Sequence, residues 1–141
     1  MSLDLLAVQD DIVAQLRTLP QDVYETTAPD DTRLTFDQNG MILPYIVIEF
    51  SDLYPSISGT GIVSTRYDLK ESFIIVSCIA PTERSARQVA NLVRDKLTGY
   101  KPVDSGELVQ AGGAVSYAAV DARPNRYVSD MSFTFLTNTV W

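Results

Sequence analysis

Histidine is absent from the 141-residue sequence, and its absence excludes several kinds of active site. Ser-His-Asp and Cys-His nucleophile systems, histidine proton shuttles and most catalytic zinc sites all require an imidazole ring. Cysteine is nearly absent too, since Cys78 is the single one and lies within the apolar run FIIVSCIA. One cysteine allows no internal disulfide, and its apolar neighbours predict a small buried core residue.

Long apolar runs are missing as well. No run approaches the roughly 20 residues that span a bilayer. The N-terminal stretch MSLDLLAVQDD contains aspartates, whereas a signal peptide has Lys or Arg residues ahead of its apolar segment. We therefore expect a protein that makes no membrane contact and stays in the cytoplasm in which it is synthesised.

Basic residues are outnumbered by acidic ones. The sequence has 11 Lys and Arg against 18 Asp and Glu, a formal net charge of -7. A protein that binds nucleic acid needs the opposite balance, because its Lys and Arg side chains neutralise phosphates and release counterions. Specific nucleic-acid binding is therefore disfavoured.

What the sequence does contain is the composition of one folded domain. Its residues are 45% apolar and 21% charged, close to the averages of globular proteins. A chain of this length buries roughly 70% of the surface that its unfolded form exposes, which suits a single core. We expect one domain over residues 1–141, without an internal repeat.

The N-terminal residues have the pattern of an amphipathic helix. Over residues 3–18 apolar side chains recur at steps of three and four, which predicts a helix with one apolar stripe. Ser2 is the expected N-cap, Asp4 suits the positive end of the helix, and Pro20 ends it.

The next residues predict an irregular segment, a strand and a loop. Residues 20–43 contain two prolines, an Asp-Asp pair and the turn signal DQNG, so we expect little regular structure beyond a short strand around residues 33–36. The run PYIVIEF, residues 44–50, is typical of a central strand buried on both faces. Residues 51–65 mix Gly, Ser, Thr and Pro, which predicts a long loop.

The second half predicts a long strand, a helix and a hairpin. From Arg66 polar and apolar residues alternate, and both faces become apolar before Pro81, so one strand runs from solvent into the interior. Thr82 is the expected cap of a helix that ends at Gly99. Its apolar stripe is Ala86, Val89, Ala90, Val93 and Leu97.

The remaining residues, 115–121 and 127–137, alternate on either side of the turn ARPNR and predict two paired strands. The order of elements is helix, two strands, helix, two strands. This order predicts an α+β fold: a single domain with a mainly antiparallel sheet of about four or more strands and two amphipathic helices packed on it.

The turn APTERSA, between the long strand and the second helix, has the position of a phosphate loop or a nucleophile turn. It lacks the glycines that let backbone amides approach an anion, and Ser85 has no histidine to activate it. The pairs Asp10-Asp11 and Asp30-Asp31 lack the spacing of a metal loop. We therefore expect no catalytic, cofactor-binding or metal-ligating residues and no enzymatic activity.

Candidate contacts with other molecules lie outside the regular elements. Arg123 and Arg126 flank the turn ARPNR, either as solvated turn residues or as contacts with an acidic neighbour such as another copy of this chain. Apolar groups in the loop 51–65 either fold over the core or meet a partner. The candidate interface residues are Tyr54, Pro55, Ile57, Arg66, Arg123, Arg126 and Trp141.

The order of three segments carries a family resemblance. An N-terminal amphipathic helix precedes LPYIVIEF, a long loop leads to SFIIVSCIAPTERSARQVANLVRDKLTG, and SYAAVDARPNRYVSDMSFTFLTN closes the chain as a hairpin. In this order the chain resembles the tail terminator (tail completion) proteins of long-tailed bacteriophages, from about Leu3 to Asn138. That family consists of small single-domain α+β proteins without a catalytic signature. The segment 20–43 departs from its pattern.

The resemblance implies a structural virion protein that forms a hexameric ring. The ring sits on the head-proximal end of the tail tube, stops the addition of tube subunits and offers its other face to the head-to-tail connector. Such a protein needs no cofactor and passes from the host cytoplasm into the virion tail. Genomic DNA would cross an acidic lumen without specific binding, because carboxylates cannot replace the counterions around its phosphates.

Two other functions remain open at this point. One is a different head-to-tail joining protein, such as a stopper or an adaptor. The other is a small hydrolase or ligand-binding α+β domain that works through Asp, Glu or Tyr without histidine, for which a deep pocket with two carboxylates would be the sign.

Overall fold

A computed structural model describes residues 4–27, 34–52, 54–55, 67–119 and 126–140 of the chain. Two helices and seven strands lie in this part, and the sheet is antiparallel except for one pair of strands, so the expected α+β fold is confirmed. The elements are α1 Leu5–Leu16, β1 Asp22–Glu25, β2 Tyr45–Phe50, β3 Tyr54–Pro55, β4 Tyr67–Ala80, α2 Glu83–Leu97, β5 Val109–Gln110, β6 Val115–Ala118 and β7 Tyr127–Val140.

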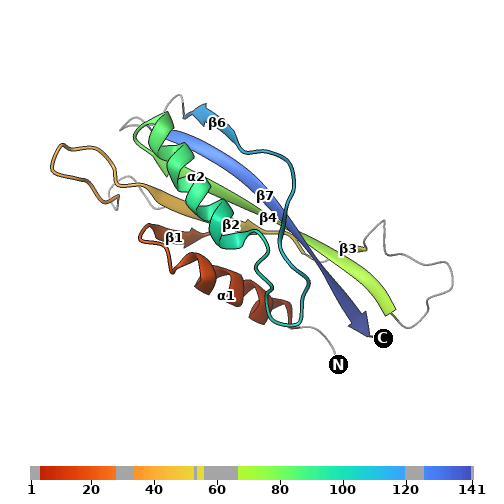
Figure 1. Ribbon diagram of the computed structural model, residues 1–141. Coiled ribbons are helices and arrows are strands. Elements are labelled where there is room, and N and C mark those ends of the chain that lie inside the picture. The colour runs from red at the N-terminus through yellow and green to blue at the C-terminus, as the bar shows by residue number, and fades with distance from the viewer. Residues whose placement is uncertain (1–3, 28–33, 53, 56–66, 120–125, 141) are drawn as a thin grey trace.

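The sheet is built around one long antiparallel pair. Strands β4 and β7 pair along fourteen residues each, from Tyr67 opposite Val140 to Ala80 opposite Tyr127. The strand order is β1-β2-β4-β7-β5, with β3 also pairing with β4 and β6 with β7. Figure 1 shows the long pair running diagonally through the whole molecule.

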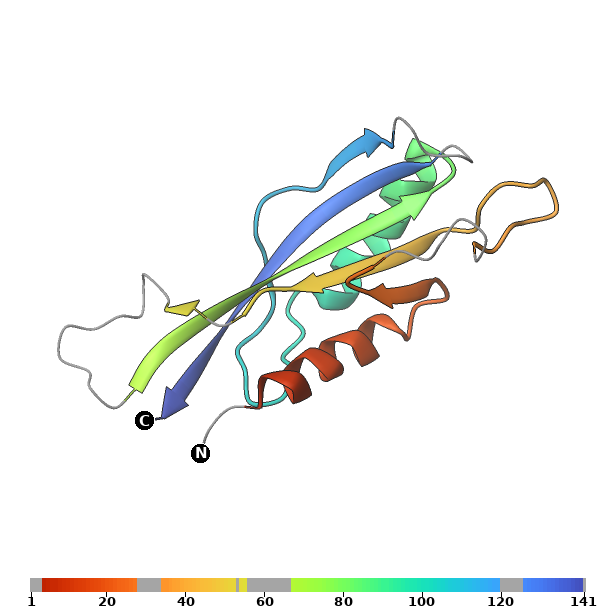
Figure 2. The same ribbon diagram turned by 180° about the vertical axis from the view of Figure 1, so that it is seen from behind.

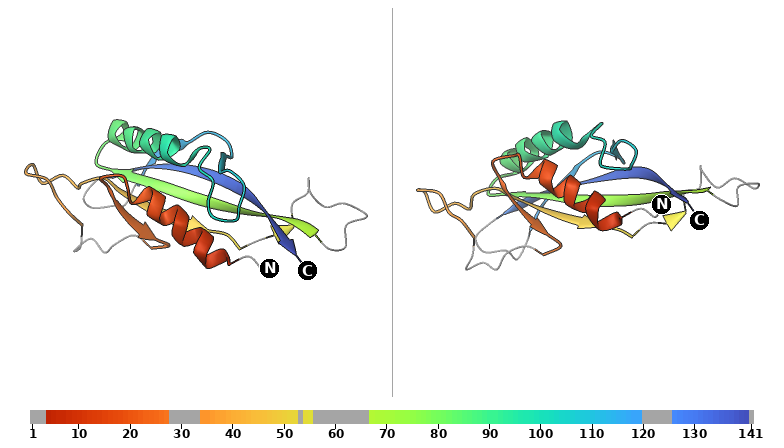
Figure 3. Two further views of the ribbon diagram at one scale, coloured as in Figure 1. Left: turned by 60° about the horizontal axis from the view of Figure 1, so that its bottom comes forward. Right: turned by 90° about the horizontal axis from the view of Figure 1, so that it is seen from below.

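Both helices cover the same face of the sheet (Figure 3). Directly opposite residues in a sheet share a face, so the register puts Ile48, Val76 and Met131 on the helix side. All three are buried in one cluster with the apolar stripes of α1 and α2. Each large side chain buried there contributes roughly 1.5 to 3 kcal/mol, so this cluster is the main source of stability.

The first helix is shorter than expected. It spans Leu5–Leu16, and its N-cap is Asp4, whose carboxylate accepts a hydrogen bond of 3.2 Å from the backbone N–H of Ala7. The expected cap, Ser2, was therefore wrong. Asp caps a helix as well as Ser does, and it adds a negative charge at the positive end of the helix dipole.

The segment 20–43 differs most from expectation. It contains β1, Asp22–Glu25, which runs parallel to β2. A strand at residues 33–36 is not present in the described part: Phe36 makes only an isolated bridge to Ile42 within a tight hairpin. Strand β1 is four residues long with one buried side chain, Val23, so the alternation is too short to detect, and its partner lies more than twenty residues away.

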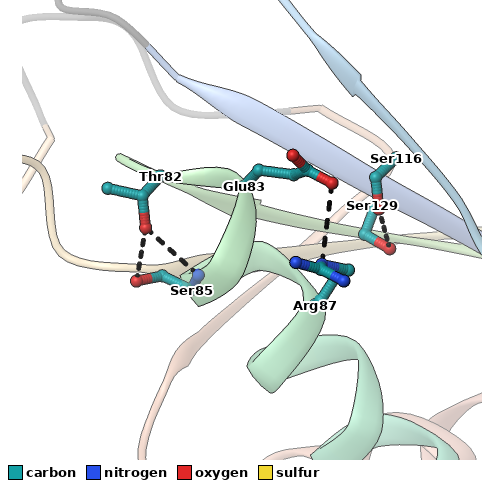
Figure 4. A network of polar contacts seen from close by, with 6 residues as sticks. All are labelled: Thr82, Glu83, Ser85, Arg87, Ser116 and Ser129. Carbon is teal, nitrogen blue, oxygen red and sulfur yellow. Dashed lines mark hydrogen bonds and ion pairs between the residues drawn. The ribbon is translucent and has the colours of Figure 1, made fainter.

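The second helix agrees with its sequence pattern. Its five expected stripe residues are its buried ones, and Gly99 follows with a φ of 80°. The cap is Thr82, whose hydroxyl accepts a hydrogen bond of 3.1 Å from the N–H of Ser85 and donates one of 2.8 Å to the Ser85 hydroxyl (Figure 4). The N–H of Ser85, one of the first-turn backbone donors that have no partner within the helix, is therefore satisfied by the cap.

Thr82→Ala removes this cap and is expected to lower the unfolding free energy by about 1 kcal/mol. Urea denaturation followed by circular dichroism measures the change. Thr98→Ala, at the other end of the same helix, is the control: Thr98 is exposed, so the change should stay below about 0.5 kcal/mol. An equal loss in both variants would contradict the assigned cap.

Candidate assembly interface

The sheet face opposite the helices, here called the open face, is only partly covered. A second apolar cluster lies at one end of it, where Leu34 and Ile42 of the hairpin 34–43 pack on Tyr45, Val47 and Ile79. Across the described residues, both helices lie on the other face. The rest of the open face is therefore a surface that this chain's own helices do not protect.

Apolar side chains are exposed at the other end of the open face. Thr134 of β7 pairs with Phe73 of β4 and with Val109 of β5, and Leu136 is two residues further along β7, so these side chains share one face. Val109 is 59% exposed, Phe73 39% and Leu136 38%. A cluster of large apolar residues in water is typical of a surface that another molecule covers.

Two carboxylates flank this cluster. Glu71 pairs with Leu136, and Glu107 precedes the edge strand β5 by two residues. Both line a surface groove of about 450 Å³ together with Val109 and Leu136. We call Glu71, Phe73, Glu107, Val109 and Leu136 the acidic patch: an apolar centre with negative charge at its rim.

The hairpin 34–43 projects from the opposite end of the molecule (Figure 2). The Asp37 carboxylate organises its tip by accepting hydrogen bonds from the N–H groups of Asn39, at 2.8 Å, and Met41, at 3.0 Å. Gly40 has a φ of 77°, a conformation that glycine adopts at little cost. The hairpin is therefore well defined and presents Phe36, Met41 and Leu43 as exposed apolar groups.

Strands β4 and β7 form a second projection. They run on as a pair beyond both helices, as Figures 1 and 3 show, and the ladder remains complete to Tyr67 and Val140. The molecule therefore has a compact middle with a hairpin at one end and a two-stranded arm at the other.

A groove of opposite character lies between α2 and β6. Its volume is about 290 Å³, and its polar lining comes from Arg87, Asn91 and Arg94 of α2 and from Ser116 and Ser129 of the β6–β7 hairpin. The two serine hydroxyls are 3.3 Å apart, and Arg87 makes a loose ion pair of 3.6 Å with Glu83 (Figure 4). We call this surface the basic groove.

Of the seven interface residues predicted from the sequence, the structure describes three. Tyr54 and Pro55 form β3, which pairs with Glu71 and Lys70 of β4. Arg126 donates a hydrogen bond of 3.3 Å to the hydroxyl of Tyr45, so one of its contacts is within the chain. The other four, Ile57, Arg66, Arg123 and Trp141, lie outside the described residues.

Sequence reasoning missed the acidic patch and the basic groove. Ahead of residue 74 the alternation in β4 predicts that Phe73 lies on the apolar face and Ser72 on the polar one. This was wrong, since Ser72 is fully buried and Phe73 is 39% exposed. The α2 arginines are visible in the sequence as a polar helix face, but their position in one groove with serines of a later hairpin depends on the fold. A signal that was available is the apolar pair Leu108-Val109 between the polar residues Glu107 and Gln110.

Tyrosines and carboxylates meet at two places on the surface. Tyr100 donates a hydrogen bond of 2.6 Å to Asp11, and Tyr117 donates one of 2.9 Å to Asp130. The hydrogen bond to Asp11 raises the pKa of Tyr100, with burial adding to it, while burial and then the Asp130 bond raise the pKa of Tyr117. Both phenols therefore stay protonated at neutral pH and tie elements together as donors.

In the part of the chain that the structure describes, no group of three or more Cys, Asp or Glu side chains could hold a metal ion. No helix among these residues is long and apolar enough to cross a membrane.

Solved structures with the same fold exist. A chain in the virion of a native gene transfer agent (GTA) particle is similar over 95% of this chain and 96% of its own length, with a TM-score of 0.65 and 17% identity. A second solved structure, whose name states no activity, covers 94% of this chain and 91% of its own, with a TM-score of 0.52 and 12% identity. The chain therefore shares its α+β fold with a chain of that particle.

Sequence comparison adds no closer relative. No protein-family model matches the chain, and no curated protein sequence matches it.

Proposed function

We propose that this protein is a structural component of a phage-like virion, and specifically a tail terminator that forms a ring on the head-proximal end of the tail tube. The observation that carries the proposal is the fold shared, along nearly the whole of both chains, with a component of a gene transfer agent virion. The order of sequence segments, which resembles tail terminators, supports the same conclusion independently.

The surface of the molecule suits this role. A ring needs two different contact surfaces on each subunit, because each copy meets one neighbour on either side. The acidic patch and the basic groove are two such surfaces, of opposite charge. The hairpin 34–43 and the β4–β7 arm extend from opposite ends, where they can meet molecules above and below a ring.

The proposed partners are further copies of this chain, the tail tube protein on one side and the head-to-tail connector on the other. The protein acts as a cap: it binds the last layer of tube subunits and offers them no surface for another layer. DNA passes through the lumen without specific binding, since the net charge of -7 repels phosphates. The protein needs no cofactor and catalyses no reaction in this role.

Sedimentation velocity tests the proposal, with and without the tail tube protein of the same particle. A hexamer of the 15.6 kDa chain has a mass of about 94 kDa. We expect this species on its own or on tube ends, together with a limit on tube length. A chain that stays monomeric in both conditions would contradict a ring. A ring that joins the connector but ignores tube ends would indicate a stopper or an adaptor instead.

A further inference from the structure

The basic groove stands out in an acidic protein. Helix α2 carries four of the eleven basic residues of the chain, Arg84, Arg87, Arg94 and Lys96, and only two acids. Arg87 and Arg94 are seven positions apart, two turns of helix, so they lie on the same side as Asn91. Positive charge is therefore concentrated on one helix side, next to β6.

The lining of the groove is made of hydrogen-bond donors. Arg94 has no hydrogen bond or ion pair from its guanidinium among the described residues, and the Arg87 pair with Glu83 is long and more than half exposed. The Ser116 hydroxyl and the Asn91 amide lie beside them. The Ser116 hydroxyl donates to Ser129, so the two guanidinium groups and the amide are the donors that remain. Together they have the chemistry that recognises a carboxylate, often with two parallel hydrogen bonds.

The acidic patch supplies the matching chemistry. Glu71 and Glu107 are carboxylates at the rim of an exposed apolar centre, which can also cover apolar parts of the neighbouring surface such as Leu92 of α2. Within one molecule the patch cannot reach the groove. Ser129 and Leu136 are seven residues apart on β7, about 23 Å along the strand, and an odd separation puts them on opposite faces of the sheet.

We infer that the basic groove of one copy receives the acidic patch of the next copy. The contact joins two different surfaces, so each copy keeps one groove and one patch for its two neighbours. Such a head-to-tail contact either closes into a ring or continues as a filament. This inference rests on the proposed function and adds to it the residues that hold the ring together: Arg87 and Arg94 on one side of each interface, Glu71 and Glu107 on the other.

Charge reversal tests the contact under the condition in which the unmodified chain assembles. Arg94→Glu and Glu107→Arg each place like charges in the interface, so each should weaken association by about a hundredfold or more. The double variant restores opposite charges in exchanged positions and should associate more tightly than either single variant. Sedimentation velocity over a concentration series gives the association constants.

Mixing the two single variants is a second arm of the experiment. An Arg94→Glu groove then meets a Glu107→Arg patch, and the unmodified groove and patch of the two chains also meet. An equal mixture should therefore recover large assemblies in which the two variants alternate, although each variant alone stays small. Assembly that stops at two chains would show a symmetric pair and overturn a head-to-tail contact.

The controls separate folding, charge and function. Arg17→Glu makes the same charge change on an exposed residue at the end of α1 that lines neither the basic groove nor the acidic patch, and it should assemble like the unmodified chain. At concentrations at which every chain is monomeric, all variants should keep the thermal midpoint of the unmodified chain. If the unmodified chain assembles and the Arg94 and Glu107 reversals leave it unchanged, this inference is wrong while the ring remains. If the unmodified chain never assembles, the proposed function fails and the inference fails with it.

Discussion

Phe133→Ala is expected to lower the unfolding free energy by about 3 to 5 kcal/mol. Phe133 has no exposed surface and belongs to the main core cluster, on the helix side of β7. It pairs with Ile74 of β4 and with Gln110 of β5, so the truncated side chain leaves a cavity at the centre of the sheet. Surrounding strands cannot close such a cavity, because their register is fixed by neighbours on both sides.

The loss is a large part of the 5 to 15 kcal/mol by which domains are usually stable. Urea denaturation of the monomeric chain measures it as a lower midpoint. Phe36→Ala is the matched control: Phe36 lies on the hairpin 34–43 and is 45% exposed, so the same change should cost less than about 1 kcal/mol. Equal losses at the two positions would contradict the assigned core.

The second large effect concerns Cys78. This thiol is buried under the helices, and burial, with a smaller contribution from the charge of Asp130, raises its pKa to about 12. A thiol reagent attacks the thiolate, which in an unfolded chain forms with a pKa of about 8.5. At pH 8 we therefore expect the folded chain to react at least about a thousandfold more slowly than the chain in strong denaturant.

Since the chain has a single cysteine, a thiol-specific chromogenic reagent reports Cys78 alone. The control is the double variant Cys78→Ala with Val103→Cys, in which the single thiol stands on an exposed loop residue outside the acidic patch and the basic groove. That variant should react within a few fold of an unfolded thiol. Fast labelling of the unmodified folded chain at pH 8 would contradict the burial of β4 beneath α2.

The same raised pKa sets a dependence of stability on pH. Because the folded chain holds the Cys78 proton more tightly than the unfolded chain, this contribution to stability is complete below about pH 8.5 and is lost as the pH rises towards 12. The raised pKa values of Tyr24, Tyr100 and Tyr117 act in the same direction above about pH 10. The urea midpoint should therefore fall with increasing pH in the alkaline range.

Local patterns in the sequence were sufficient for the central elements of the fold. The stripe of α2 repeats over about three turns, and the alternation in β7 extends over a long strand, so the period of both is clear. Strand β1 was missed because four residues carry almost no period and its pairing with β2 is distant in sequence. The cap of α1 was misplaced by two residues, since Ser2 and Asp4 have equal capping chemistry.

Little of the candidate interface could be predicted from the sequence. Its acidic patch brings together residues on or next to β4, β5 and β7 from segments that are 27 or more positions apart, and its basic groove joins α2 to the later hairpin. Apolar residues on both faces of β4 do not reveal which face the helices cover, and that choice decides whether Phe73 is core or surface. The sequence-derived interface residues lie in other segments, and their role remains a prediction.

The central claim is that this chain assembles head to tail into a ring that caps a tube. Negative-stain electron microscopy of the purified chain, alone and mixed with tail tubes, tests it most directly. We expect rings with a central hole and six-fold symmetry, free in solution or seated on one end of each tube. Single compact particles in both samples, with bare tube ends, would contradict it.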